Sequence, residues 1–186
     1  KELMQIFEKT YGPVKRDLRT AMDSAKSKEA AKKLKTDYIS NGPEYLLVDG
    51  YNIIFAWDEL KELAKDNLDA ARQRLINIMC NYQGVRQCNL ILVFDAYKVK
   101  GNVGEIEKYH NITIVYTKEA ETADMYIEKT TNQLGKDYRV RVATSDGLEQ
   151  LIILAHGALR VSASEFKYEV DAVENAIREF ITEQNT

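Results

Sequence analysis

The sequence predicts an α/β fold in which a parallel sheet is covered by helices on both faces. Short runs rich in Val, Ile and Leu alternate with longer segments whose apolar residues have helical spacing. The apolar runs are nearly continuous, which is typical of strands that are buried on both faces. No hairpin turn sequence is evident between neighbouring runs, so we expect helical crossovers between parallel strands.

The first strand is expected over residues 45–49, where an apolar run ends at an aspartate that a glycine follows. A helix or helical turn is expected over 55–65, and residues 68–82 have the apolar spacing of a longer helix. Asp69, near the start of that helix, suits the positive end of the helix dipole. A second strand over 90–95 also ends at an aspartate.

The second half of the sequence continues the alternation. Residues 96–102 are expected to be a polar, basic loop, and 104–109 a short turn or edge strand. Gly135 directly follows the segment 122–134, which is expected to be a helix, and is expected to end it at the C′ position that glycine often takes. Strands are expected over 112–116, 139–144 and 159–162, and helices over 122–134, 147–154 and from 163 or 170 to 181.

Two parts of the chain are expected, a helical extension or linker over residues 1–40 and one domain over 44–182. The residues Asn41-Gly42-Pro43 mark the boundary. The extension carries ten Lys or Arg and six Asp or Glu, so it is either a solvated linker or a basic arm that contacts RNA or a ribosome-sized partner. Because residue 1 is Lys rather than Met, we expect the chain to be a piece of a longer one.

Composition narrows the class of protein. A content of 45% hydrophobic and 30% charged residues is that of a globular protein in solution. No apolar run approaches the ~20 residues of a membrane span, and the first residues do not form a signal peptide, so we expect a cytoplasmic protein. Cys80 and Cys88 lack the spacing of a zinc site and are expected to be ordinary buried thiols. The net charge of −3 neither requires nor excludes an RNA partner.

Acidic residues follow several predicted strands. Asp49, Asp95 and Asp146 each come at the end of an apolar run, and Glu121 and Asp124 lie where the third strand gives way to its helix. Right-handed crossovers bring the carboxyl ends of parallel strands to one edge, where open α/β sheets bind ligands. Glu121 and Asp124 are three residues apart, so they are expected to share one face of a helix.

This group of carboxylates favours a metal-dependent nuclease. Crowded carboxylates repel one another unless a cation is present, and oxygen ligands without His or Cys suit Mg²⁺ or Mn²⁺. Two such ions about 4 Å apart can activate a water and stabilise the leaving oxygen of a phosphodiester. Each acid also has a purely structural interpretation, for example Asp146 as a helix N-cap and Asp49 as a turn residue. Their joint placement at one edge favours the metal site.

Several stretches together resemble the NYN domain, a branch of the PIN-like nucleases, and in particular its bacterial YacP-like subgroup. The resemblance covers about residues 44–182 and includes a late strand within 158–163. The stretches that carry it are Val48-Asp49-Gly50-Tyr51-Asn52-Ile53-Ile54, Val93-Phe94-Asp95-Ala96, Glu121-Thr122-Ala123-Asp124 and Ala143-Thr144-Ser145-Asp146.

The resemblance implies a three-layer α/β/α sandwich around a mostly parallel sheet, and a Mg²⁺- or Mn²⁺-dependent endoribonuclease. In this subgroup the activity is associated with the ribosome and with cleavage of mRNA. Carried over by motif, Asp49, Asp95, Asp124 and Asp146 would be the catalytic, metal-binding acids, and Glu121 would support the metal or its waters.

The same resemblance implies further contacts around these acids. Asn52, Thr144 and Ser145 would hold carboxylates or phosphate oxygens. Arg74 lies in a segment that resembles the family's helix after the first motif, and its alternative is a surface arginine. Residues 8–19, outside the domain, resemble the tail of translational GTPases of the elongation-factor G or ribosome-protection type, which also points to the ribosome.

Single-stranded RNA is usually bound through its backbone charge and by stacking of its bases on aromatic rings. Tyr51 and Tyr97 each stand two residues after a strand-end acid, so both are expected to stack bases, unless Tyr51 packs inward. Lys98 and Lys100 are expected to meet phosphates, with solvated lysines as the alternative. Lys118 is a further candidate.

Other functions remain as alternatives. A catalytically silent RNA- or ribosome-binding module of the same fold is the main one. A phosphatase of the haloacid dehalogenase type would need a second acid two residues after Asp49, where this sequence has Tyr51. Neither a dinucleotide-binding nor a P-loop motif occurs.

Overall fold

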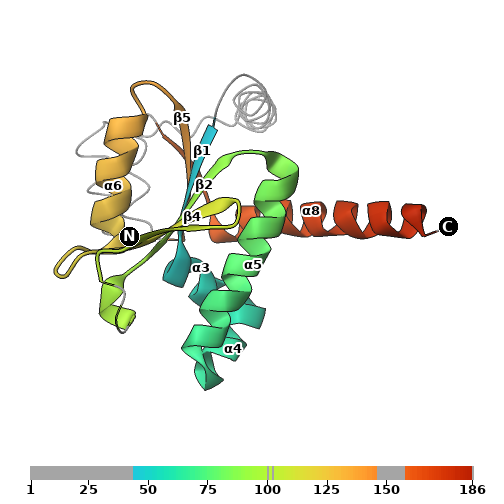
Figure 1. Cartoon of the computed structure of the whole chain (residues 1–186), viewed down its shortest axis with the longest axis horizontal. Coiled ribbons are helices and arrows are strands. Elements are labelled where there is room, and N and C mark those ends of the chain that lie inside the picture. The colour runs from blue at the N-terminus through green and yellow to red at the C-terminus, as the bar shows by residue number, and fades with distance from the viewer. Residues whose placement is uncertain (1–43, 100, 102, 146–157, 186) are drawn as a thin grey trace, which may run out of the picture. The chain divides into compact units, whose positions relative to one another are not determined.

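The structure is a computed structural model that describes residues 44–99, 101, 103–145 and 158–185 (Figure 1). These residues all belong to one compact unit, Gly42–Thr186. The predicted extension over 1–40, the boundary at 41–43 and the predicted helix over 147–154 lie outside the described residues. None of the described helices combines the length and the apolar character needed to cross a lipid bilayer.

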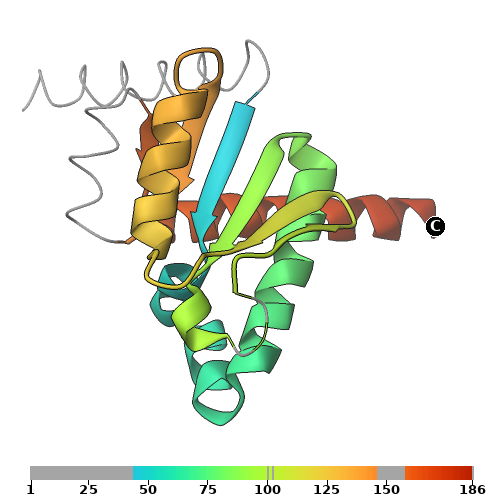
Figure 2. The same ribbon diagram turned by 60° about the vertical axis from the view of Figure 1, so that its left-hand side comes forward.

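The described strands form one six-stranded sheet in the order β3-β4-β2-β1-β5-β6. All neighbouring pairs are parallel except β3 and β4, so the predicted mostly parallel α/β fold is confirmed. β1 lies in the centre between β2 and β5 (Figure 2). The strands are β1 (Glu44–Asp49), β2 (Asn89–Phe94), β3 (Ile106–Tyr109), β4 (Ile112–Tyr116), β5 (Arg139–Ala143) and β6 (Leu159–Val161).

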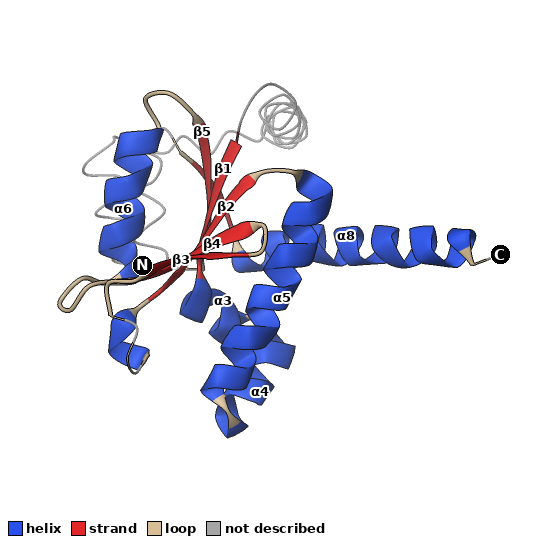
Figure 3. Ribbon diagram, in the orientation of Figure 1, coloured by secondary structure: helices blue, strands red, loops and turns tan. Residues whose placement is uncertain are grey.

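Helices cover both faces of this sheet (Figure 3). Leu46 and Val48 on β1 pack into a core with α3, α4, α5 and α8, whereas Leu47 packs into a second core with α6. All three side chains are fully buried, which explains why the strand sequence is continuously apolar. The helices are α3 (Gly50–Ala56), α4 (Asp58–Asp66), α5 (Leu68–Arg86), α6 (Ala123–Leu134) and α8 (Ala163–Gln184), with a 3-10 turn η1 at Ala96–Lys98.

Three long helices begin at residues with good capping side chains. The Asn67 side chain accepts a hydrogen bond from the Ala70 N–H at the start of α5. Thr122 and Ser162 cap α6 and α8 in the same way. These oxygens satisfy amide groups that the first turn of a helix leaves without partners.

The helix predicted over 55–65 is wrong in its limits. α3 begins at Gly50, directly after β1, and a break at Trp57 separates it from α4. Trp57 has extended backbone angles and is buried, and its indole N–H donates to the Ala163 carbonyl at 2.8 Å. The hydrogen bond and burial of Trp57 hold it against α8 and thereby separate α3 from α4. The sequence has no glycine or proline at this break.

No hairpin was predicted from the sequence, but the structure contains one, so this prediction is wrong. β3 and β4 are antiparallel and are joined through His110 and Asn111. His110 takes a left-handed φ of 49°, a role that glycine or asparagine fills in most tight hairpins. α6 ends at Leu134, directly before Gly135 as predicted, but Gly135 is its C-cap with a right-handed φ of −63° rather than its C′ residue.

A buried ionic network joins β5, β1, α8 and α5. The Arg141 guanidinium is 2% exposed and donates to Glu44 Oε1 at 3.2 Å and to Glu169 Oε1 at 2.6 Å. The Tyr82 hydroxyl donates to the other Glu169 oxygen at 3.0 Å. Burial acts to lower the pKa of Arg141, but hydrogen bonding and charge from Glu169 and Glu44 outweigh it and raise the pKa.

The two cysteines are free and partly buried. Burial raises the pKa of the Cys80 thiol. Burial is also the largest cause that raises the pKa of the Cys88 thiol, to about 11. Both groups are therefore protonated at neutral pH, as expected for ordinary thiols.

Gly50 is expected to tolerate no side chain. A Cβ at this position would lie 2.4 Å from Phe94 Cε1, and the Phe94 ring is fully buried between the rings of Tyr51 and Tyr116. We expect Gly50→Ala to lower the free energy of unfolding by about 1–3 kcal/mol. Urea denaturation measures this loss.

Gly84, inside α5, is the matched control for Gly50. The nearest atom to its added Cβ is 3.9 Å away, so Gly84→Ala is expected to stabilise the helix by up to about 1 kcal/mol. Equal unfolding free energies for the two variants would contradict the crowding at Gly50.

Candidate active site

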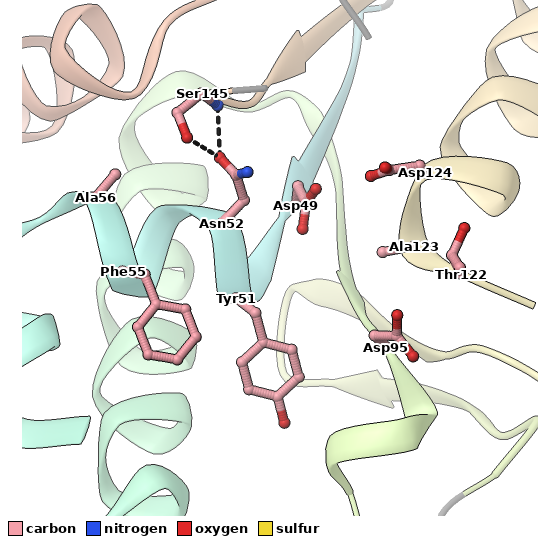
Figure 4. A pocket seen from close by; sticks show the side chains of 10 residues that line it. All are labelled: Asp49, Tyr51, Asn52, Phe55, Ala56, Asp95, Thr122, Ala123, Asp124 and Ser145. Atoms are coloured by element: carbon pink, nitrogen blue, oxygen red, sulfur yellow. Dashed lines mark hydrogen bonds between the residues drawn. The ribbon is translucent and has the colours of Figure 1, made fainter. Parts of the chain in front are cut away.

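A pocket of about 410 Å³ lies at the carboxyl ends of β1, β2 and β5 (Figure 4). The amino end of α6 forms its opposite wall. We call it the acid pocket, and its lining residues are Asp49, Tyr51, Asn52, Phe55, Ala56, Asp95, Thr122, Ala123, Asp124 and Ser145.

Three of the predicted acids line this pocket from three different elements. Asp49 is the last residue of β1 and is 6% exposed. Asp95 follows β2, and its Oδ1 accepts from the Tyr97 N–H at 3.1 Å. Asp124 lies in the first turn of α6, and its carboxylate points toward Asp49 in Figure 4. The structure therefore brings together side chains that are up to 75 residues apart in the sequence.

The oxygen donors of the acid pocket are of the type that hard cations prefer. They are carboxylate, amide and hydroxyl oxygens, without His or Cys, and such donors suit Mg²⁺ or Mn²⁺. Among the described residues, no group of three or more His, Cys, Asp or Glu side chains lies close enough to hold a metal ion. Asp146, the fourth predicted acid, lies outside the described residues and directly follows Ser145.

Asn52 connects α3 to the end of β5. Its Oδ1 accepts from both the backbone N–H and the hydroxyl of Ser145, each at 2.5 Å (Figure 4). This link fixes the backbone that leads into residue 146. Thr144 is fully buried, its N–H donates to the Val161 carbonyl, and it does not line the acid pocket.

Comparison with known proteins decides the family. The family model of the YacP-like NYN domain matches residues 46–186. This chain belongs to the YacP-like NYN family.

Two solved structures and one curated sequence support the assignment. The uncharacterized protein YacP of Bacillus subtilis (strain 168) is 44% identical over 135 residues, which are 72% of this chain and 79% of that protein. The crystal structure of Rae1 (YacP) from Bacillus subtilis has a TM-score of 0.66 and 42% identity, and covers 75% of this chain and 80% of that one. A tryptophan-to-leucine mutant of Rae1 has a TM-score of 0.67 and 39% identity, over 76% and 84% of the two chains. The YacP-like domain therefore has a PIN-like, nuclease-type α/β fold.

Glu121 is placed differently from the prediction. In this YacP-like domain α6 begins at Ala123 with Thr122 as its N-cap, so Glu121 precedes the helix and does not share a face with Asp124. Its carboxylate forms an ion pair with Lys129 at 3.2 Å and is 15% exposed. Glu121 lines a neighbouring pocket instead of the acid pocket. Its predicted role beside the metal gains no support from this geometry.

Tyr51 packs inward and presents no free ring face to a base. Its side chain is 5% exposed, and its ring contacts Phe55 and Phe94. Its hydroxyl accepts from Arg72 Nη1 at 3.4 Å, and burial, the largest cause, raises the pKa of that hydroxyl. The structure therefore has the inward packing that was the alternative to base stacking, and Tyr51 forms a wall of the acid pocket.

Of the predicted basic contacts, Arg74 is described in full and lies outside the acid pocket. Arg74 is 55% exposed, forms an ion pair with Glu59 at 3.3 Å and does not line the pocket, which agrees with a surface arginine. The Lys98 side chain and the whole of Lys100 lie outside the described residues, so their roles stay predictions. Tyr97 is 95% exposed and lines the neighbouring pocket.

Four lining residues were absent from the predicted set: Phe55, Ala56, Thr122 and Ala123. Thr122 caps α6 and lines the acid pocket, and a threonine just before a predicted helix is a recognisable signal for such a role. Phe55 and Ala56 line the pocket because α3 begins earlier than predicted. Nothing in the sequence pattern indicated that start.

Replacing Asn52 by alanine is expected to loosen the end of β5. The change removes one acceptor of two hydrogen bonds, and each such bond contributes about 1 kcal/mol. We expect the Ser145 amide to exchange its hydrogen roughly tenfold faster or more. Nuclear magnetic resonance of the amide measures this rate. Asn77→Ala is the control, because Asn77 accepts only from the exposed Gln73 side chain, and an unchanged Ser145 rate in the Asn52 variant would contradict the link.

Proposed function

We propose that this protein is a metal-dependent endoribonuclease that hydrolyses RNA phosphodiester bonds in the cytoplasm. Its proposed substrate is mRNA associated with the ribosome. The observation that carries the proposal is the convergence of Asp49, Asp95 and Asp124 on one pocket of a PIN-like, nuclease-type fold. The resemblance to the YacP-like subgroup supplies the ribosome as the expected setting.

Asp49, Asp95 and Asp124, with Asp146 as the predicted fourth acid, would hold Mg²⁺ or Mn²⁺. Such a cation, when bound, makes water more acidic and stabilises the charge that develops on phosphate oxygens. Asp49 is almost fully buried, and the lower dielectric around it strengthens its attraction for a cation. Asn52 acts as a positioning residue, since it holds Ser145 and thus the backbone next to Asp146.

No described side chain is arranged to act as a covalent nucleophile. The described lining of the acid pocket contains no Cys, Lys or His, and Ser145 donates its hydroxyl hydrogen to Asn52 rather than to a base. Hydrolysis by an activated water is therefore the reaction that the lining residues suit best, because carboxylates orient and deprotonate water without forming an intermediate.

A catalytically silent RNA- or ribosome-binding module is the second candidate. The observation that favours it is that the described acids do not by themselves form a group able to hold a metal ion. In that case Asp49 and its neighbours would contribute to the fold or to binding, and RNA would be bound without cleavage.

Cleavage assays decide between these two functions. We expect cleavage of RNA in Mg²⁺ or Mn²⁺, a rate at least about a hundredfold lower in excess chelator, and recovery when the metal is added back. Parallel reactions on free RNA and on translating ribosomes show whether the ribosome is part of the substrate. RNA binding without cleavage in every condition, by a folded protein, would favour the silent module.

A further inference from the structure

A second pocket adjoins the acid pocket and shares Asp95 and Thr122 with it. It has a volume of about 730 Å³, within the range of cavities that hold small organic groups. We call it the side pocket. It lies between the turn η1 and the turn that connects β4 to α6, at Lys118–Thr122. A group bound there would directly neighbour whatever occupies the acid pocket.

An exposed aromatic ring borders the side pocket. Tyr97 is 95% exposed, and no aromatic ring among the described residues packs on it. Val103, also in the lining, is 50% exposed, and Ala96 and Ala120 add further apolar surface. Large exposed apolar side chains cost solvation free energy, so their presence at a concave surface indicates a binding role.

Charge in the side pocket disfavours a phosphate. The described ionisable side chains in its lining are Asp95, Glu119 and Glu121 against one cation, Lys118, besides the Tyr97 phenol. Because Glu121 is paired with Lys129, the excess consists of Asp95 and Glu119 over Lys118, and these carboxylates would repel a phosphate. A planar, uncharged nucleobase would not be repelled, and it can stack on Tyr97 with a gain of about 1–3 kcal/mol.

Glu121 adds selectivity to this pocket. Its carboxylate is 15% exposed and is held by the ion pair with Lys129, which restricts its movement. An ionised carboxylate only accepts hydrogen bonds, so a base beside it must present donors. Guanine presents two adjacent donors on its Watson–Crick edge, N1–H and the 2-amino group, which match the two carboxylate oxygens. Uracil has one donor between two acceptors, which a carboxylate repels.

We propose that the side pocket holds one unpaired RNA base, stacked on Tyr97 and read by Glu121, with guanine preferred. The inference rests on the proposed function, because it places this base next to the phosphate that the acid pocket would cleave. It gives Glu121 a role in base recognition instead of the metal-supporting role that the sequence predicted. Tyr97 and Glu121 would therefore control where RNA is cut.

The stacking role is tested with short unstructured RNAs that carry 2-aminopurine at one position, moved along the strand. Stacking on Tyr97 quenches the fluorescence of this base. With unmodified protein we expect quenching at one position, beside the cleaved bond. Tyr97→Ala is expected to abolish the quenching and to raise KM at least about fivefold, with kcat within twofold, whereas Tyr97→Phe retains both.

Tyr168→Ala is the matched control, because Tyr168 is 79% exposed on α8 and lines neither the acid pocket nor the side pocket. The Tyr97 N–H that binds Asp95 belongs to the backbone and is kept in every variant. Equal quenching and equal KM in the Tyr97→Ala and Tyr168→Ala proteins would overturn the proposal.

The reading role is tested with RNAs that carry guanosine, inosine or uridine at the quenched position. Inosine lacks the 2-amino group and keeps N1–H. We expect kcat/KM to fall at least about threefold from guanosine to inosine and further to uridine, and Glu121→Gln to remove most of this difference. Equal rates for the three bases in the unmodified protein would overturn the role of Glu121.

Failure of the proposed function gives a different result. In that case the unmodified protein cleaves neither free RNA nor RNA on translating ribosomes in Mg²⁺ or Mn²⁺, whatever base is present. If the unmodified protein cleaves RNA and neither Tyr97→Ala nor Glu121→Gln changes the reaction, the proposed base pocket is overturned. The proposed nuclease function is then retained.

Discussion

The Asp49→Asn protein is expected to cleave RNA at least about a hundredfold more slowly than the unmodified protein while remaining folded. Asparagine has nearly the same shape as aspartate, but it supplies no negative charge to a cation. Asp49 is the most buried of the three described acids, so little water is available to replace the lost charge. Cleavage in Mg²⁺ and in Mn²⁺ measures the effect.

Stability in chelator separates loss of chemistry from loss of fold. Asp95 and Asp124 line the same pocket, so removal of one negative charge relieves repulsion in the metal-free protein. The melting temperature of Asp49→Asn in chelator is expected to be at least as high as that of the unmodified protein. Asp66→Asn is the control, because Asp66 is exposed at the end of α4 and lines neither of the two pockets. Full activity of the Asp49→Asn protein would rule out the metal site that we propose.

The Arg141→Ala protein is expected to lose about 3–5 kcal/mol of unfolding free energy. The change leaves the carboxylates of Glu44 and Glu169 without their shared cation and opens a cavity beneath β5. Glu169→Gln is expected to cost less, because Glu44 still pairs with Arg141 and the amide oxygen can still accept a hydrogen bond. Urea denaturation compares the two variants.

Arg178→Ala on the exposed side of α8 is the control for Arg141 and should change the unfolding free energy by no more than about 0.5 kcal/mol. If Arg141→Ala is no more destabilising than Arg178→Ala, the network of Arg141 is not a major source of stability.

The centre of the fold could be predicted from the sequence, because burial on both faces leaves an unmistakable pattern. β1, β2 and β4 are short runs of mostly apolar residues, and a helix or turn follows each of them. β5 is poorer in apolar residues, because Arg139 and Arg141 alternate with valines in it. The rule that parallel strands end at one edge then placed Asp49 and Asp95 together, as the acid pocket shows.

Two of the parts that were missed depend on contacts between distant residues. The break at Trp57 is fixed by a hydrogen bond to Ala163, and the inward position of Tyr51 is fixed by Phe94 on β2. Local spacing holds no information about such partners. The error at Glu121 is of another kind and is local: its spacing to Asp124 fits a helix, but the N-cap Thr122 makes α6 begin after Glu121.

The position of β1 in the sheet has a consequence for the order in which the domain can assemble during its synthesis. β1 is the first described strand to be made, yet one of its two neighbours is β5, whose residues 139–143 pair with residues 44–48. Ser145, which meets Asn52 in the acid pocket, is 93 residues further along the chain. Because the chain is made from its amino end, β1 can pair with β2 early. The other side of β1 stays unpaired until β5 has been made. The nascent chain thus carries only part of the acid pocket until β5 and Ser145 have been made.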